Sequence, residues 1–120
     1  MAFTGMADFL LQGLVVGASG VIAGGANVAP RACVRVYELW KEGRVEEAGE
    51  AQKMLARGDW VLTKYAIPGT KSALQSYFGY GGVPRAPLEG LDEEAVGKVR
   101  EGVRELMEWE ARLPDVEEGL

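Results

Sequence analysis

The sequence has no histidine and a single cysteine, Cys33, among its 120 residues. Without histidine the chain lacks the usual general base and a common metal ligand, and a serine or cysteine triad of the familiar type is excluded. One cysteine cannot form an intrachain disulfide. Basic residues are also few: 13 lysines and arginines are outnumbered by 18 acidic residues. The resulting net charge of −5 gives no electrostatic footprint for nucleic acid, so no nucleic-acid partner is expected.

Charge is absent from Phe9 to Ala29, a stretch of 21 residues that is long enough to span a membrane. Five glycines and three polar residues lower its hydrophobicity, however, and no basic cluster flanks it to set an orientation. We therefore expect no membrane partner. No basic n-region or arginine-rich presequence is readable either, so a cytoplasmic location is expected and a mitochondrial one stays open.

The same uncharged stretch is better explained by a helix that begins near Phe9, turns at 17–20 and leads into an apolar strand over Gly20–Gly24. A strand without polar alternation is typical of a parallel sheet that is buried on both faces. One strand cannot make a sheet. The chain is therefore expected to be part of a larger parallel α/β fold.

Amphipathic helices are predicted for the rest of the chain from apolar residues spaced three and four apart. Their expected bounds are Pro30 to Gly43, about Val45 to Tyr65, a short helix that ends before Gly79, and Asp92 to Leu113. Residues 79–87, with three glycines and two prolines, are expected to form an extended connection. Asp92 is the expected N-cap of the last helix and Asn27 that of the helix after Pro30. The three tryptophans are expected to be core or interface anchors: Trp40, Trp60 and Trp109.

Several strings of the sequence, in unbroken order, resemble the dihydrodipicolinate synthase/N-acetylneuraminate lyase superfamily of class I aldolases. They are Phe3-Thr4-Gly5, GASGVIAGGANVAP at 17–30, YELWKEGRVEEA at 37–48, IPGTK at 67–71, FGYGG at 78–82 and PRAPL at 84–88. The last three strings are most similar to the 4-hydroxy-2-oxoglutarate aldolase branch.

The resemblance implies a fold. Members are (β/α)₈ barrels, which need about 250 residues or more, and this chain corresponds only to their C-terminal part. Residues 1–43 would supply the end of strand seven, helix seven, strand eight and helix eight. Residues 44–114 would form a C-terminal helical subdomain, and 115–120 a frayed acidic tail. The fold class is thus α/β, as a barrel fragment that is mostly α-helical as it stands.

The resemblance also implies an activity on pyruvate or a related 2-oxo acid. In the family, a lysine on strand six forms a Schiff base with the substrate and a tyrosine on strand five relays protons, and both align upstream of Met1. We therefore expect a chain that is inactive alone, with no catalytic residue, cofactor or metal of its own. The expected substrate-binding residues are Gly5, which lets the backbone approach the 2-oxo acid, and Ile22, which lies beside the Schiff base. Each residue also has a purely structural explanation: Gly5 can be a turn glycine, and Ile22 can pack within the barrel.

None of the chain's own lysines is expected to replace the missing one, and Lys71, the most interesting, is interpreted as a helix-surface residue. A different class of function stays open. The chain could be a non-catalytic helical interaction module that binds itself or a full-length homologue, because a strand edge without neighbours invites association. A homo-oligomer is expected in either case.

Overall fold

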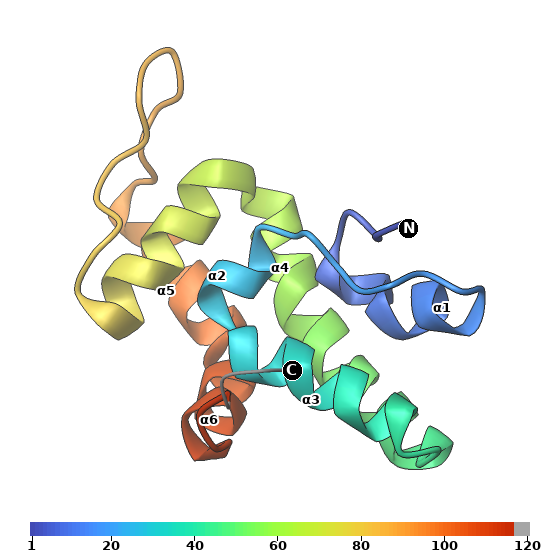
Figure 1. The fold of residues 1–120 in the computed structure, drawn as a ribbon. Coiled ribbons are helices and arrows are strands. Elements are labelled where there is room, and N and C mark those ends of the chain that lie inside the picture. Colours follow the sequence, from blue (N-terminus) through green and yellow to red (C-terminus); the bar gives the residue numbers. More distant parts are fainter. Residues whose placement is uncertain (117–120) are drawn as a thin grey trace.

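The computed structural model describes residues 1–116 as a set of packed helices (Figure 1). The elements in chain order are η1 (Ala7–Phe9), α1 (Leu10–Val15), α2 (Gly25–Val28), α3 (Pro30–Lys41), α4 (Val45–Phe78), α5 (Glu93–Gly102) and α6 (Arg104–Arg112). The long α4 packs against α3, α5, α6 and η1, so it organises the molecule. None of the described helices has the length and apolar character that crossing a membrane requires.

The expected strand over Gly20–Gly24 is not formed as such within residues 1–116. Only an isolated parallel bridge joins Thr4 and Val21. The Thr4 N–H donates to the Gly20 carbonyl at 3.0 Å, and the Ile22 N–H donates to the Thr4 carbonyl at 3.0 Å. The two segments are thus extended and parallel. Each has only the other as a neighbour in the described chain, so the pairing stays a bridge.

A sharp bend divides α4 where the sequence predicted a stop. Ala66 has φ 54° and ψ −145°, which lies outside the helical region, and Pro68 follows. A proline inside a helix removes one backbone donor and crowds the preceding turn. The predicted second and third helices are therefore the two halves of α4. The second half ends at Gly79, whose left-handed φ of 77° suits a glycine C-cap.

The last helix also differs from its prediction, because it is broken into α5 and α6 at Val103. The backbone ladder continues through the break, with Val103 donating to Val99 and Met107 donating to Val103. Gly102 sits so close to α4 that an added Cβ would lie 2.9 Å from Val61. The predicted cap is confirmed, since the Asp92 carboxylate accepts from the Ala95 N–H at 2.8 Å.

The core consists of two clusters that both include residues of α4. One joins α1, α3 and the first half of α4, and includes Leu10, Val36 and Leu55; the other joins α2, both halves of α4, α5 and α6. Burial raises the pKa of Cys33, in the first cluster, to about 12. A core role for Trp60 is wrong, because 55% of this residue is exposed. It follows Asp59 directly and lies outside the buried face of α4.

The connection between α4 and α5 extends away from the helices as a long loop (Figure 1). Most of its residues are exposed, including Val83 and Leu88. The acidic tail expected at 115–120 lies mostly outside the described residues. Residues 115 and 116 of this tail are described, and Asp115 forms an ion pair with Arg31 on α3.

Candidate functional site

The two parallel segments end at the same edge of the molecule, and a pocket of about 270 Å³ lies there. Gly5, directly after Thr4, lines it together with Ala23, Gly24 and Gly25. A Cβ added to Gly5 or Gly24 would meet no other atom within 4 Å, so the space beside both glycines is open. Carboxyl ends of parallel strands are where barrel enzymes build their active sites. This pocket is therefore the candidate functional site.

The opposite wall of the pocket comes from α4 on both sides of its bend. Leu62 and Asp59 lie at the inner end, and four further residues complete this wall: Thr63, Ala66, Ile67 and Thr70. Thr70 Oγ1 donates to the Ala66 carbonyl at 3.3 Å. The unusual backbone of Ala66 thus lies at the pocket, and strained backbone is concentrated at functional sites.

Gly5 and Ile22, the two predicted substrate-binding residues, lie differently relative to the pocket. Gly5 lines the pocket. Ile22 immediately precedes the pocket residue Ala23, does not itself line the pocket, and is 72% exposed. Its backbone N–H is used in the bridge to Thr4. The roles of both residues toward a 2-oxo acid stay predictions.

Two polar side chains of α4 hold the start of the helix that follows Gly5. Asp59 Oδ2 accepts from the Asp8 N–H at 3.1 Å. Gln52 accepts from the Leu11 N–H at 2.7 Å and donates to the Ala7 carbonyl at 3.0 Å. Since η1 has no side-chain cap of its own, α4 supplies the missing acceptors and fixes the loop that carries Gly5.

Asp59 is only 5% exposed, and burial raises the pKa of its carboxyl, as does the nearby Asp8 to a smaller extent. The backbone hydrogen bonds from Asp8 and Ala7 act in the opposite direction. Gly25 packs directly on this carboxyl group: an added Cβ would lie 2.2 Å from Oδ1. The wall of the pocket therefore contains a buried acid that is in contact with a glycine.

The start of α3 is also capped by a side chain from a distant helix. Glu110 on α6 is 5% exposed, and it accepts from the Arg31 N–H at 3.0 Å and the Ala32 N–H at 2.7 Å. The expectation that Asn27 caps α3 is wrong. Asn27 lies within α2 and donates to the Gly24 carbonyl instead. A carboxylate that accepts two N–H groups at a helix start also complements the helix dipole.

Sequence reasoning missed Gln52, Asp59 and Glu110, although a signal for all three exists. Gln52 and Asp59 share the three-and-four spacing of the buried Leu55 and Leu62. A polar residue in a buried register must find a partner, which marks it as a capping or site residue. Glu110 has the same kind of signal, because it lies three and four residues after the buried Met107 and Leu106.

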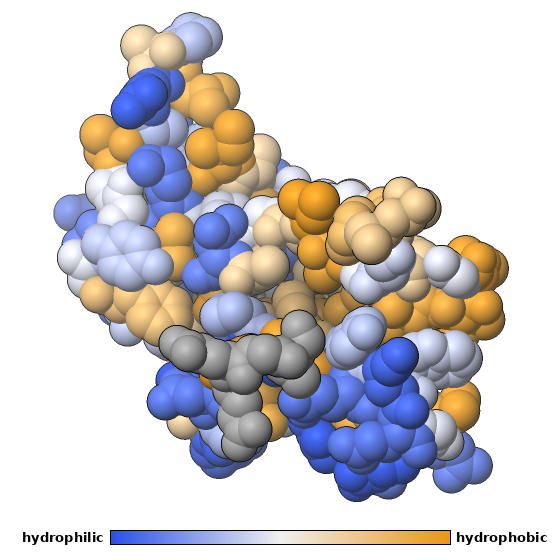
Figure 2. Space-filling view, in the orientation of Figure 1, coloured by the Kyte–Doolittle hydropathy of each residue, from blue (hydrophilic) through white to orange (hydrophobic). Residues whose placement is uncertain are grey.

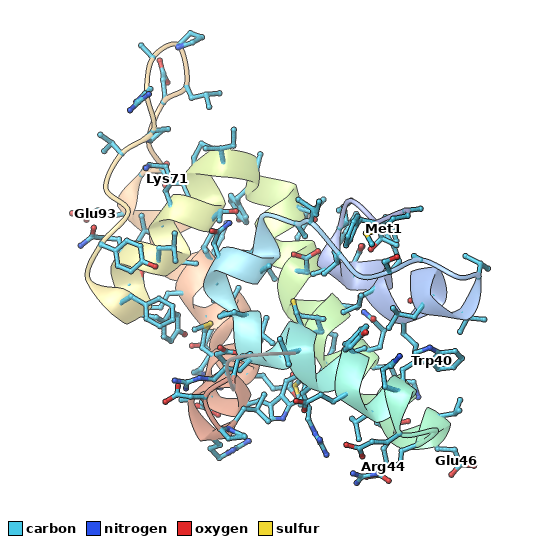
Figure 3. All side chains as sticks on the ribbon, viewed as in Figure 1. Met1, Trp40, Arg44, Glu46, Lys71 and Glu93 are labelled. Atoms are coloured by element: carbon cyan, nitrogen blue, oxygen red, sulfur yellow. The ribbon has the colours of Figure 1, made fainter. Side chains whose placement is uncertain are left out.

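None of the five lysines lines the pocket. Lys71 lies on the second half of α4, well away from the N-terminal segment labelled by Met1 (Figure 3). Lys53 and Lys98 form surface ion pairs with Glu50 and Glu94. Within residues 1–116 no three acidic or cysteine side chains are grouped so that they could hold a metal ion.

A second feature of this end of the molecule is its apolar surface, visible over the N-terminal segment and α1 (Figure 2). We call its residues the N-terminal apolar patch, and they are Phe3, Phe9, Val15, Val16 and Ile22. Large apolar surfaces of this kind mark places where another chain or segment packs.

Comparisons with known proteins give the family of the chain. Residues 1–106 match the Dihydrodipicolinate synthetase family. An L-threo-3-deoxy-hexylosonate aldolase of Aspergillus niger is 57% identical over 97% of the chain and 35% of its own length. The "Probable 4-hydroxy-2-oxoglutarate aldolase, mitochondrial" of Emericella nidulans is 48% identical over 94% of the chain and 37% of its own length. A dihydrodipicolinate synthase family protein from Coccidioides immitis has a TM-score of 0.79 at 33% identity, covering 93% of this chain and 39% of its own.

This chain belongs to the dihydrodipicolinate synthase family of aldolases. It spans about a third of the length of the curated relatives it matches, and it corresponds to their C-terminal part.

Proposed function

We propose that the chain forms the C-terminal part of a Schiff-base-forming aldolase that acts on pyruvate-type 2-oxo acids. The observation that carries the proposal is the pocket beside Gly5, at the carboxyl ends of two parallel segments. The relatives are named as aldolases, and these names support the same class of enzyme. In this proposal residues 1–43 complete the barrel and 44–114 form the subdomain that positions them.

The chemistry requires a group that this chain does not place at the pocket. An iminium accepts the electron pair of the breaking carbon–carbon bond, and it forms on an amine held in a dry site. The pocket contains no lysine among its lining residues. We therefore propose that the chain is inactive alone, and that its contribution is the open backbone at Gly5 and the walls around the 2-oxo acid.

Borohydride trapping tests this assignment. In the test protein, which we call the joined enzyme, this chain replaces the matching C-terminal part of the Aspergillus niger aldolase. Incubation with pyruvate and borohydride, followed by mass measurement, should show an adduct on the joined enzyme and none on the chain alone. An adduct on the chain alone would show that one of its own lysines forms the iminium.

The position of Gly5 provides the sharper part of the test. Gly5→Val fills the open space beside the backbone, so adduct formation by the joined enzyme should fall while its unfolding midpoint changes little. Gly43→Ala is not a suitable control because its φ of 75° disfavours a side chain. Gly49→Ala, in α4 with open space around it, is the better one. Normal trapping by Gly5→Val would contradict the assigned role.

A second candidate function rests on the N-terminal apolar patch. As a separate polypeptide the chain would expose this patch, and it would then associate with itself or with a barrel-bearing homologue. A homo-oligomer is part of this proposal. The cytoplasmic location is also a proposal, and the Emericella nidulans relative carries the word mitochondrial in its name.

A further inference from the structure

The buried carboxyl group of Asp59 lies between the two loops that form the pocket beside Gly5. On one side, Asp59 Oδ2 accepts a hydrogen bond of 3.1 Å from the N–H of Asp8, in the loop that contains Gly5. On the other side, a Cβ added to Gly25 would lie 2.2 Å from Asp59 Oδ1, so this oxygen rests against the backbone of Gly25. Gly5, Gly25 and Asp59 all line the pocket. One side chain of α4 thus contacts the loop that follows each of the two parallel segments.

The two loops also meet each other at this carboxyl group. The same Cβ added to Gly25 would lie 3.4 Å from the Cβ of Ala7, the first residue of η1. Ala7, Gly25 and Asp59 are all buried. Interiors are closely packed, so neither loop can shift at this point without disturbing the carboxyl group.

A carboxyl group is an unfavourable choice here for packing alone. Burial raises the pKa of Asp59, and the charge of Asp8 acts in the same direction. The Oδ1 atom of Asp8 is itself buried, with no hydrogen-bond partner within residues 1–116. The hydrogen bond from the Asp8 N–H only partly offsets these costs. Groups that are unfavourable for stability are concentrated at functional sites, which points to a role for Asp59 at the pocket.

We propose that Asp59 is a positioning residue for the 2-oxo acid, because its carboxyl group contacts the Asp8 N–H and Gly25 at once and so fixes the spacing of the two loops around the pocket. This inference rests on the proposed function and names a residue that shapes its site. Since η1 has no side-chain cap of its own, Gly5 keeps its place only while α4 holds η1. The helical subdomain at 44–114 then contributes to substrate affinity as well as to stability.

The affinity of the joined enzyme for pyruvate is the measurement. The initial rate of borohydride trapping, followed against pyruvate concentration, gives a half-saturating concentration and a limiting rate. Asp59→Ala removes the acceptor and the contact with Gly25, so the half-saturating concentration should rise by roughly 10-fold, the upper end for one hydrogen bond, at an unchanged limiting rate. Asp59→Asn keeps one acceptor oxygen at nearly the same volume, and its rise should stay below about 3-fold.

Glu110→Ala is the matched control. Glu110 is also a carboxylate that is 5% exposed and accepts from N–H groups at the start of a helix, but it does not line this pocket. Its removal should lower the unfolding midpoint of the joined enzyme and leave the half-saturating pyruvate concentration as it is. A merely structural role of Asp59 predicts that same pattern for Asp59→Ala.

The contact between Asp59 and Gly25 is tested by combining two substitutions. Gly25→Ala alone displaces the carboxyl group, so it should raise the half-saturating pyruvate concentration. In the Asp59→Ala background the added Cβ enters the space that the carboxyl group leaves, and Gly25→Ala should then add little. Two residues in contact show such non-additive effects, whereas independent sites do not.

The outcomes separate this inference from the proposed function. If the joined enzyme gives no adduct at any pyruvate concentration, the proposed function is wrong and this inference falls with it. If the parent is trapped but Asp59→Ala keeps its half-saturating concentration, only the inference is overturned. Equal rises in Glu110→Ala and Asp59→Ala, or an effect of Gly25→Ala that is the same in both backgrounds, would overturn it too. A rise in Asp59→Ala that Asp59→Asn largely reverses supports it.

Discussion

The carboxylate of Glu110 accepts a hydrogen bond of 2.7 Å from the backbone N–H of Ala32, across 78 residues of the chain. The same carboxylate accepts from Arg31, so α6 satisfies two of the free N–H groups at the start of α3. Glu110→Ala removes both bonds and leaves these groups buried, which should lower the free energy of unfolding by about 2 kcal/mol. Urea unfolding followed by circular dichroism measures the change.

Glu108→Ala is the matched control for that experiment, because Glu108 lies on the exposed side of the same helix, where it pairs with Arg104 at the surface. Its effect should stay within about 0.5 kcal/mol. Glu110→Gln keeps one acceptor oxygen, so its cost should fall between the two. Equal effects of Glu108→Ala and Glu110→Ala would show that the bonds to α3 do not stabilise the fold.

Neighbouring glycines provide a second prediction. Gly25→Ala would place a Cβ 2.2 Å from Asp59 Oδ1, so either α2 or the buried carboxyl group must move. Gly24→Ala meets nothing within 4 Å, and its φ of −58° suits any residue. We expect Gly25→Ala to destabilise the chain by about 1–3 kcal/mol and Gly24→Ala to have little effect, as measured by thermal unfolding. The reverse order would contradict the close contact.

The raised pKa of Asp59 predicts a pH dependence of stability. Because the pKa of the folded state lies above the unfolded value of 3.8, the proton is bound more tightly in the folded chain. The stabilisation that comes from this tighter proton binding at Asp59 is full below pH 3.8 and is lost as the pH rises through the folded-state pKa. Relative to Asp59→Asn, the wild-type chain should therefore lose stability as the pH rises above 3.8 and through the folded-state pKa of Asp59.

Urea titrations of both proteins at several pH values test this, since the other carboxyl groups are common to the pair and cancel in the difference. Asp8, which also raises the pKa of Asp59, is present in both. A difference that does not change with pH, or one in which the wild type gains stability as the pH rises, would show that the Asp59 carboxyl group is not destabilised by its burial.

Association of the isolated chain is the fourth prediction. Nothing within residues 1–116 covers the N-terminal apolar patch, so light scattering should find oligomers. Val16→Glu adds a charge to a residue that is 85% exposed, and it should shift the population toward monomers. Val83→Glu, on the exposed loop between α4 and α5, should not. A monomeric parent protein that unfolds cooperatively would contradict the prediction.

The sequence predicted well those elements whose signals are local. The start of α3 at Pro30, the cap at Asp92 and the end of α4 at Gly79 depend on residues within one turn of each boundary. Burial of the apolar face of α4 followed from its spacing in the same way. The core alternative for Trp60 was wrong because a large aromatic residue was given more weight than its register on the helix, which faces solvent; the interface alternative stays a prediction.

The candidate site was only partly predictable. Gly5 was reached through the resemblance to a family, whereas the wall formed by Thr63, Ala66 and Thr70 depends on how α4 folds back over the carboxyl ends of the parallel segments. The caps from Glu110 and Asp59 reach residues 78 and 51 positions away. Such pairings arise from tertiary packing, and no short motif in the sequence encodes them.

The distance along the chain between Ala32 and Glu110 has a consequence for synthesis. A ribosome synthesises residues 30–41 well before it reaches residue 110. During that interval the first turn of α3 has no acceptor for its N–H groups, because Pro30 and Ala29 offer no side-chain cap. The helix can therefore acquire its final anchoring only after Glu110 has left the ribosome, and a nascent chain stalled before α6 would expose that end of α3 to chaperones.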